Sequence, residues 1–93
     1  MIDKQFYFVY ILRSLKHQWF YSGHTDNIPL RKMQHDIGQV QASSPHRPLE
    51  LIFFEGYENK YDAIRREKYF KTSKGKTTLR WMLREYFHNH PLE

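Results

Sequence analysis

Three runs of apolar residues alternate with polar turns along the first two thirds of the chain. Residues 6–12 read Phe-Tyr-Phe-Val-Tyr-Ile-Leu, and this dense aromatic and β-branched run predicts a buried strand. A polar turn over residues 13–18 leads into a second run over residues 19–23, so the two segments predict an antiparallel hairpin. A third run over residues 49–57, closed by Gly56, predicts a third strand.

Capping residues and helical spacing predict three helices around these strands. Three consecutive N-cap residue types, with Gly38 at the far end, predict a short helix over residues 28–37. Asn59 opens a second helix that should run to about Lys71. A turn then breaks the chain, and residues 77–87 predict a final helix. The order β-β-α-β-α-α predicts an α+β fold in which a small three-stranded antiparallel sheet is flanked by helices.

The length of 93 residues fits one domain with a single modest core. We expect that domain over residues 1–87, followed by a disordered tail over residues 88–93 whose final Leu92-Glu93 resembles residues left by a cloning vector. No run approaches the ~18 apolar residues of a membrane span, and the first residues lack a signal-peptide layout. The sequence has no cysteine, which excludes disulfides and thiolate metal sites. We therefore expect a cytoplasmic protein that does not interact with membranes.

Positive charge is concentrated in the last third of the chain. The sequence has 15 Lys and Arg residues against 10 Asp and Glu residues, which gives a net charge of +5. Residues 60–85 hold nine of the basic residues and only three of the acidic ones, so this segment carries +6 and the rest is about neutral. Such clustering suits a surface that binds a polyanion such as nucleic acid. The alternative is a solvated helical face.

Glu67 has an unusual position on the second predicted helix. At ~100° per residue it falls in the same sector as Ala63 and Phe70, which should face the core. A carboxylate on this side is costly unless a partner compensates its charge. The partner is either a lysine at helical spacing, Lys60 or Lys71, or a divalent cation. Because Mg²⁺ often takes only one or two carboxylates with waters and a substrate phosphate, periodicity alone leaves both alternatives open.

Four short segments together resemble the signature of the GIY-YIG nuclease superfamily. The Phe-Val-Tyr that ends at Tyr10 and the Tyr-Ser-Gly that begins at Tyr21 resemble its two half-motifs. Arg31 lies ten residues after Tyr21, and His35 lies four residues after Arg31. Residues 63–69 resemble the helix that carries the single metal-binding glutamate of the family. The order and spacing of the four segments make the resemblance more specific than any one of them.

The resemblance covers residues 6 to about 87 and is to the small stand-alone bacterial members, including the YhbQ-like group. It implies a metal-dependent endonuclease, which is a phosphodiester hydrolase. The substrate would be DNA rather than RNA, recognised by its structure, and the role would be in DNA repair. In that family pattern Glu67 would hold Mg²⁺ or Mn²⁺, and Tyr10 would act as general base. Tyr21 would position the water or the phosphate, and Arg31 would bind the scissile phosphate through its planar fork.

Further residues would support this chemistry. His35 would take part in a proton relay or contact a phosphate, and His24 is a secondary candidate at the same edge. The nucleic-acid backbone would lie along five basic residues: Lys71, Lys74, Lys76, Arg80 and Arg84. The resemblance covers a nuclease domain and includes no separate DNA-recognition module. Substrate choice would therefore come from the domain surface, from oligomerisation or from a protein partner.

Two departures from the family pattern bear on activity. Ser22 replaces a usually apolar residue, and Lys32 stands at the normally apolar position after Arg31. The apolar stripe of this predicted helix consists of Leu30, Met33 and Ile37. A helix that buried this stripe would aim Arg31 away from the tyrosines, and Arg31 and His35 would then form a solvated face. The alternative function is therefore a non-catalytic nucleic-acid-binding module on a degenerate nuclease scaffold; a pure protein-interaction domain has the least support.

The remaining histidines and two aromatic residues have simpler interpretations. No metal-ligand spacing connects His17, His46, His88 and His90. We therefore expect no histidine-rich metal site. Trp81 and Phe87 are expected to close the core.

Overall fold

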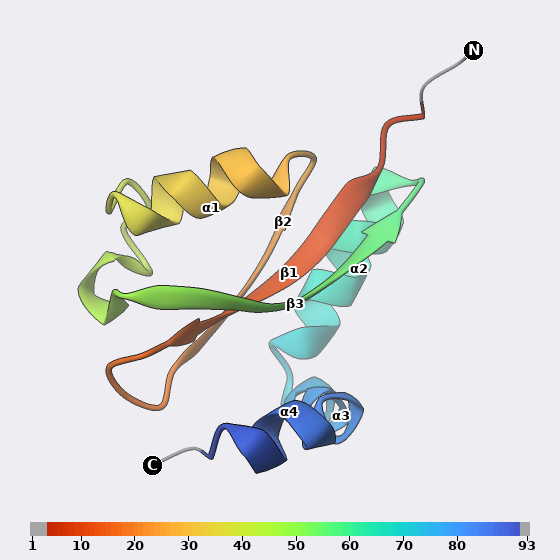
Figure 1. The fold of residues 1–93 in the computed structure, drawn as a ribbon. Helices are drawn as coiled ribbons and strands as arrows, with labels where there is room; N and C mark the ends of the chain where they lie inside the picture. The colour runs from red at the N-terminus through yellow and green to blue at the C-terminus, as the bar shows by residue number, and fades with distance from the viewer. Residues whose placement is uncertain (1–3, 92–93) are drawn as a thin grey trace.

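The computed structural model of the protein describes residues 4–91, so the vector-like Leu92-Glu93 lies outside the described residues. A three-stranded sheet has helices on both of its faces (Figure 1). The elements in chain order are β1 (Tyr7–Ser14), β2 (Phe20–Thr25), α1 (Ile28–Asp36), a short 3₁₀ helix η1 (Ser44–His46), β3 (Leu49–Tyr57), α2 (Lys60–Phe70), α3 (Ser73–Met82) and α4 (Arg84–Asn89).

The strands pair in the order β2-β1-β3, and both pairings are antiparallel. The central strand, β1, places Tyr10 opposite Gly23 on β2 and opposite Phe54 on β3. The register with β3 shifts between Ile11 and Leu12. These observations confirm the predicted α+β fold and the three-stranded antiparallel sheet, with β3 spanning the predicted residues.

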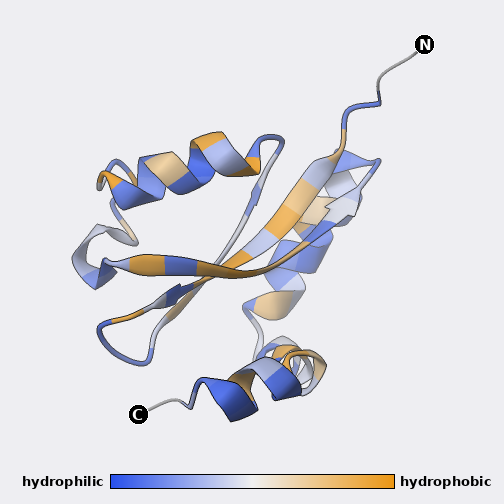
Figure 2. Cartoon of the chain, in the orientation of Figure 1, coloured by the Kyte–Doolittle hydropathy of each residue, from blue (hydrophilic) through white to orange (hydrophobic). Residues whose placement is uncertain are grey.

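Because β1 is central, its alternating side chains fill a core cluster on each face of the sheet. Val9 and Ile11 point to the face covered by α2 and α3, where they pack against Ala63, Phe70 and Leu79. Figure 2 shows apolar stretches, in orange, along β1 and β3.

The second cluster lies on the opposite face, beneath α1. Tyr10 and Leu12 of β1 pack there with Leu49 of β3 and Ile28 of α1. Figure 1 shows α1 on the other side of the sheet from α2, α3 and α4. The candidate chemistry of Tyr10 is thus built into a core face rather than added to a loop.

Side-chain caps begin the three longer helices. Asn27 accepts from the backbone N–H of Leu30 at 3.0 Å, and Asn59 accepts from that of Tyr61 at 2.8 Å. After α1, Gly38 has φ +83°, and its N–H donates to the carbonyl of His35. A side chain at this left-handed position would be strained, so Gly38 fixes the exit from the helix as predicted.

The C-terminal helices differ from the prediction of one helix over residues 77–87. Thr72 accepts from the N–H of Gly75 at 3.0 Å and caps a helix that already begins at Ser73. The helix ends at Met82, and the short α4 follows Leu83. The sequence Thr-Ser-Lys-Gly suggested a turn, but here it is a cap followed by a helical first turn.

Two further C-terminal expectations need revision. Trp81 does not close the core: it is exposed, and the guanidinium of Arg84 lies 4.5 Å from its ring centroid. In place of a disordered segment from His88, α4 continues to Asn89. Arg13 holds the following residues by donating to the carbonyls of His90 and Pro91, each at 3.1 Å. Within residues 4–91, no helix is both long and apolar enough to cross a membrane.

Candidate active site

The two motif tyrosines meet over a glycine on the edge strand. Tyr10 on β1 is buried, and its ring lies across Gly23 of β2 with the half-buried Tyr21 beside it. The two ring centroids are 6.1 Å apart. A Cβ on Gly23 would lie 2.6 Å from the Tyr10 hydroxyl oxygen and 2.8 Å from Cε2 of Tyr21. The last residue of the Tyr-Ser-Gly segment is therefore glycine because the tyrosine rings fill the space of a side chain.

We expect Gly23→Ala to destabilise the protein by about 1–3 kcal/mol, because the added methyl group overpacks the tyrosine pair. It should also displace the Tyr10 hydroxyl. Gly56→Ala is the matched control, since a Cβ there meets the Phe8 ring at 3.1 Å and the Phe6 ring only at 3.8 Å. Urea unfolding of both variants checks the prediction. An equal, small loss of stability in the two variants would contradict it.

Helix α1 presents Arg31 and His35 to the site and its apolar stripe to solvent. Arg31 donates from Nε to the Tyr10 hydroxyl at 3.4 Å and from Nη1 to Gln34 at 3.0 Å. His35 is the fully buried residue of this helix. The apolar stripe is exposed at Leu30, Met33 and Ile37. The expectation that this stripe would rotate Arg31 away from the tyrosines is therefore wrong, and the alternative of a solvated Arg31 and His35 face is wrong with it.

Lys32, the departure that raised this doubt, has a local role. Its ammonium group pairs with Asp36 one turn later, with N–O distances of 2.7 and 2.9 Å. An i,i+4 pair of this kind stabilises an exposed helix face by a few tenths of a kcal/mol. Lys32 therefore does not change the direction of Arg31.

A buried chain of hydrogen bonds runs from Tyr10 into the protein. The Tyr10 hydroxyl lies 2.8 Å from Nε2 of His35, and Nδ1 of His35 lies 2.6 Å from Oγ of Ser43. Ser43 in turn donates to the carbonyl of Val40 at 3.4 Å. Because the serine proton is used there, Nδ1 of His35 carries the imidazole proton, and Nε2 accepts from Tyr10. Sequence reasoning missed Ser43, because it lies between the predicted helix over residues 28–37 and the predicted strand over residues 49–57, and no motif marks it.

The pKa values of this chain follow from its burial. Burial raises the pKa of Tyr10 to about 12, although the hydrogen bond from Arg31 opposes this shift. Burial and the charge of Arg31 lower the pKa of His35 to about 4. At neutral pH, Tyr10 is therefore a protonated phenol and His35 a neutral imidazole with a free acceptor nitrogen.

The neutral His35 should make stability depend on pH. Its pKa is about 4 in the folded protein and ~6.5 in an unfolded chain, so between these values only the unfolded state binds the proton. The stabilisation is complete above pH ~6.5, and about 3 kcal/mol is lost as the pH falls toward 4. Urea unfolding at several pH values measures this loss. In His35→Gln the slope between pH 6.5 and 4.5 should be smaller, and equal slopes in the two proteins would rule out this origin.

Glu67 of α2 lies at the same edge of the sheet, bound by two basic side chains. Nδ1 of His24 donates to its Oε1, and Nζ of Lys71 donates to its Oε2 at 2.6 Å. Burial raises the pKa of Glu67, but these two hydrogen bonds outweigh it and hold the pKa below its ordinary value. The ionised carboxylate is near enough for its charge to raise the pKa of Tyr10. Of the two lysines predicted as structural partners, Lys71 forms the ion pair.

The residues around Glu67 fit a divalent cation of low protein coordination. Across residues 4–91, no three His, Asp or Glu side chains gather as a metal centre. A single ionised carboxylate beside an exposed edge still matches the usual Mg²⁺ arrangement, in which water and substrate phosphate complete the coordination. Because His24 and Lys71 now occupy its oxygens, a cation must replace at least one of these contacts.

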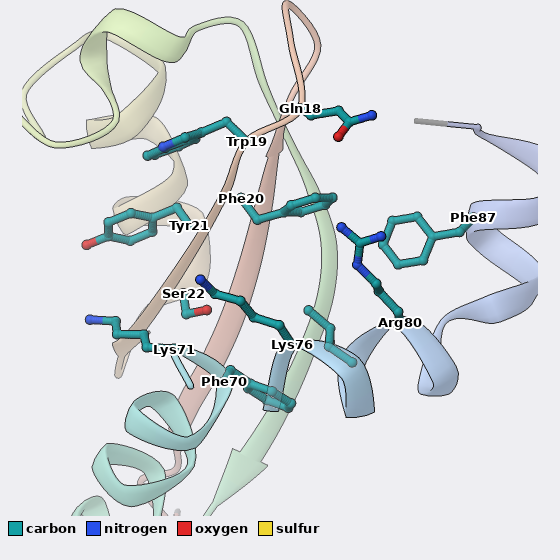
Figure 3. Close-up of a pocket in the computed structure, with 11 residues that line it drawn as sticks. Gln18, Trp19, Phe20, Tyr21, Ser22, Phe70, Lys71, Lys76, Arg80 and Phe87 are labelled. Carbon is teal, nitrogen blue, oxygen red and sulfur yellow. The ribbon is translucent and has the colours of Figure 1, made fainter. Parts of the chain in front are cut away.

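A groove of about 430 Å³ adjoins this edge (Figure 3). Its walls are β2 on one side and α3 and α4 on the other, and Phe20 and Phe87 meet across it edge to face at 5.8 Å. The aromatic and basic lining residues include Trp19, Phe20, Tyr21, Phe70, Phe87, Lys71, Lys76 and Arg80. Of the five predicted backbone-binding residues, Lys71, Lys76 and Arg80 line the groove, whereas Lys74 and Arg84 are exposed outside its lining.

Comparison with known proteins shows the family of the chain. The family model described as the GIY-YIG catalytic domain matches residues 6–80. A protein named "UPF0213 protein in ldhD 5'region" from Pediococcus acidilactici is 34% identical, over 70% of this chain and 69% of its own length. A UPF0213 protein from Pediococcus pentosaceus is 39% identical over 71% of this chain and 68% of its own, and UPF0213 protein YazA from Bacillus subtilis is 33% identical over 70% and 66%. No solved structure shows a significant match. Because this family model covers most of the chain, the chain belongs to the GIY-YIG family, and it is similar to UPF0213 proteins.

Proposed function

We propose that the protein is a divalent-metal-dependent endonuclease that cleaves phosphodiester bonds in DNA. The observation that carries the proposal is the direction of Arg31: its guanidinium points to the Tyr10 hydroxyl, so a positive fork and a candidate base face the same space. Hydrolysis of a phosphodiester needs both groups, one to accept a proton from water and one to stabilise charge on the phosphate.

In this mechanism Tyr10 receives the proton of the attacking water as it passes its own proton to Nε2 of His35. The 2.8 Å contact gives the path, and Ser43 keeps the accepting nitrogen free. Because the pKa of Tyr10 is about 12 and that of His35 about 4, the transfer is uphill in the resting site. Positive charge beside the phenol favours its ionised form, and Arg31 supplies part of that charge.

Arg31 also binds the scissile phosphate, since its guanidinium offers several donors in a fixed plane. Tyr21, beside Tyr10, positions the water or the phosphate. Glu67 holds Mg²⁺ or Mn²⁺, which supplies Lewis-acid stabilisation of the phosphate charge when bound. Lys71 and Lys76 neutralise neighbouring phosphates along the groove.

The groove supports nucleic acid as the substrate class. Basic side chains reach into it from α3, and aromatic rings of β2 form its opposite wall (Figure 3). Phosphates bind the first kind of group, and unpaired bases stack on the second. We infer that DNA with a branch, a nick or a single-stranded segment is the substrate, and that the activity serves DNA repair.

A cleavage panel tests the proposal. Branched, flapped, nicked and single-stranded DNA and RNA are incubated with Mg²⁺ or Mn²⁺ and the wild-type protein or Arg31→Lys. We expect metal-dependent cleavage of at least one DNA by the wild type, reduced about 100-fold or more in Arg31→Lys. Salt-sensitive binding without cleavage under either metal would favour the non-catalytic module instead.

A further inference from the structure

We propose that His24 is a second ligand of the cation held by Glu67, through Nδ1, and that this ligand gives the site a preference for Mn²⁺ over Mg²⁺. The inference rests on the proposed function, since it concerns the metal of that same site. It adds a donor beyond the single glutamate and decides between the two ions that a lone carboxylate accepts equally.

The geometry places both donor atoms at one point. His24 is on β2, directly after Gly23, and points to the sheet face that α2 covers. Its Nδ1 contacts Oε1 of Glu67, although the two residues are 43 positions apart in the sequence. Cation ligands at ~2.1 Å stand ~3 Å from one another, so a small side-chain rotation opens the pair for an ion.

Access to this point differs among the three side chains around it. The His24 side chain is 35% exposed and the Glu67 side chain 14% exposed. Lys71, the other partner of Glu67, is 55% exposed and reaches the carboxylate from the next helical turn. An arriving dication therefore displaces the long, mobile ammonium of Lys71 most easily, because it offers the same carboxylate a higher charge.

The freed Lys71 then has a second role. Its side chain also lines the groove, so the displaced ammonium remains beside the expected path of the nucleic-acid backbone. Lys71 thus pairs with the Glu67 carboxylate when no cation is bound and contacts a phosphate when the cation is bound. Among the described residues, Lys71 and His24 are the two basic side chains that bond to Glu67. Once Lys71 is displaced, His24 is the donor that stays with the cation.

Ligand chemistry gives the preference. Mg²⁺ takes oxygen ligands almost exclusively, whereas imidazole nitrogen binds the later divalent ions and increases their relative affinity. A carboxylate with an adjacent imidazole therefore favours Mn²⁺, and a carboxylate alone does not. If the His24–Glu67 contact were only a salt bridge, the imidazole would move away from the bound cation and no such preference would arise.

Electron paramagnetic resonance of Mn²⁺ tests the proposal without any cleavage. Bound Mn²⁺ is titrated in the wild type, His24→Gln and Glu67→Gln, Mg²⁺ affinity is obtained by competition, and ¹⁴N modulation from a coordinated imidazole is recorded by spin-echo spectroscopy. His46→Gln is the control, because His17 and His46 also face each other, at 2.6 Å, and could bind an ion of their own.

We expect ¹⁴N modulation in the wild type and in His46→Gln, and none in His24→Gln. The Mn²⁺ dissociation constant should rise about tenfold or more in His24→Gln, with Mg²⁺ affinity changed less than about threefold. Glu67-dependent Mn²⁺ binding without ¹⁴N modulation would overturn the proposal, as would modulation that persists in His24→Gln. Cleavage with no modulation would support the nuclease function and reject His24 as a metal ligand. Modulation without cleavage of any substrate would support His24 as a ligand and reject the nuclease function.

Discussion

Replacing Glu67 with glutamine should reduce metal-dependent cleavage about a thousandfold or more while the protein remains folded. The carboxylate is ionised because its pKa lies below the ordinary value, and a neutral amide cannot hold a divalent cation in its place. A loss of about 4 kcal/mol of transition-state stabilisation corresponds to this factor. Initial rates at saturating Mn²⁺ and Mg²⁺ measure it.

Glu55→Gln is the matched control. Glu55 lies on β3 and is also a partly buried carboxylate in an ion pair, with Nε of Arg66 at 2.6 Å. Substitution there removes one negative charge and one salt bridge and changes the acceptor of the Tyr57 hydroxyl, but it does not touch Tyr10, Tyr21 or Arg31. We expect cleavage within about threefold of the wild type, since only the general field changes. Equal losses in the two variants would mean that Glu67 acts through charge or folding and not through a cation.

Tyr10→Phe should lower the cleavage rate about 100- to 10,000-fold, the range for loss of a general base. The ring remains and continues to fill the space over Gly23, so the sheet is retained. Removal of the hydroxyl leaves Nε2 of the buried His35 without its partner, which should cost about 1–3 kcal/mol of stability. Single-turnover rates and urea unfolding measure the two effects separately.

Tyr57→Phe is the control for this change. The pKa of Tyr57 is also raised to about 12, by burial and by its hydrogen bond to Glu55, but it lies outside the candidate site. We expect wild-type rates from it. The relay starts from a protonated Tyr10 and a neutral His35, and with pKa values of about 12 and about 4 both forms persist from pH 6 to 9, so the wild-type rate should stay level over this range. A Tyr10→Phe protein with the wild-type rate and pH profile would exclude Tyr10 as the base.

The strands and the position of Glu67 were predictable because both depend on local pattern. Residues 49–57 form β3 with the bounds that their apolar run indicates. Helical periodicity alone predicts that Glu67 faces the sheet together with its apolar neighbours on α2, and its carboxylate lies there in the structure. Such features follow from the 2.0 and 3.6 residue periods and need no tertiary information.

The orientation of α1 was not predictable in the same way. Hydrophobicity favours burial of the stripe that contains Leu30 and Met33, yet the helix buries His35 instead. The reason is tertiary: Tyr10 and Ser43 satisfy both ring nitrogens of His35, so the buried imidazole costs little. Hydrophobic pattern does not contain these partners, because Ser43 approaches from a loop and Tyr10 from a strand.

The C-terminal region shows a second limit. Thr72 and Gly75 read as turn residues, but the hydroxyl of Thr72 caps α3 and the N–H of Gly75 is the donor that it satisfies. A Cβ on Gly75 would lie 1.8 Å from the carbonyl oxygen of Tyr69, so the glycine serves close packing of α2 on α3. Turn and cap use the same residue types, and only the packing of the neighbouring helix separates them.

The most direct test of the central claim starts from protein already bound to DNA. Wild-type protein and each DNA of the panel are combined in chelator, binding is verified, and excess Mn²⁺ or Mg²⁺ is then added to start a single-turnover reaction. One metal-dependent site built from Tyr10, Arg31 and Glu67 predicts that the bound strand is cut only after the ion is added. DNA that stays bound and intact with every divalent ion, in each substrate of the panel, would contradict the account.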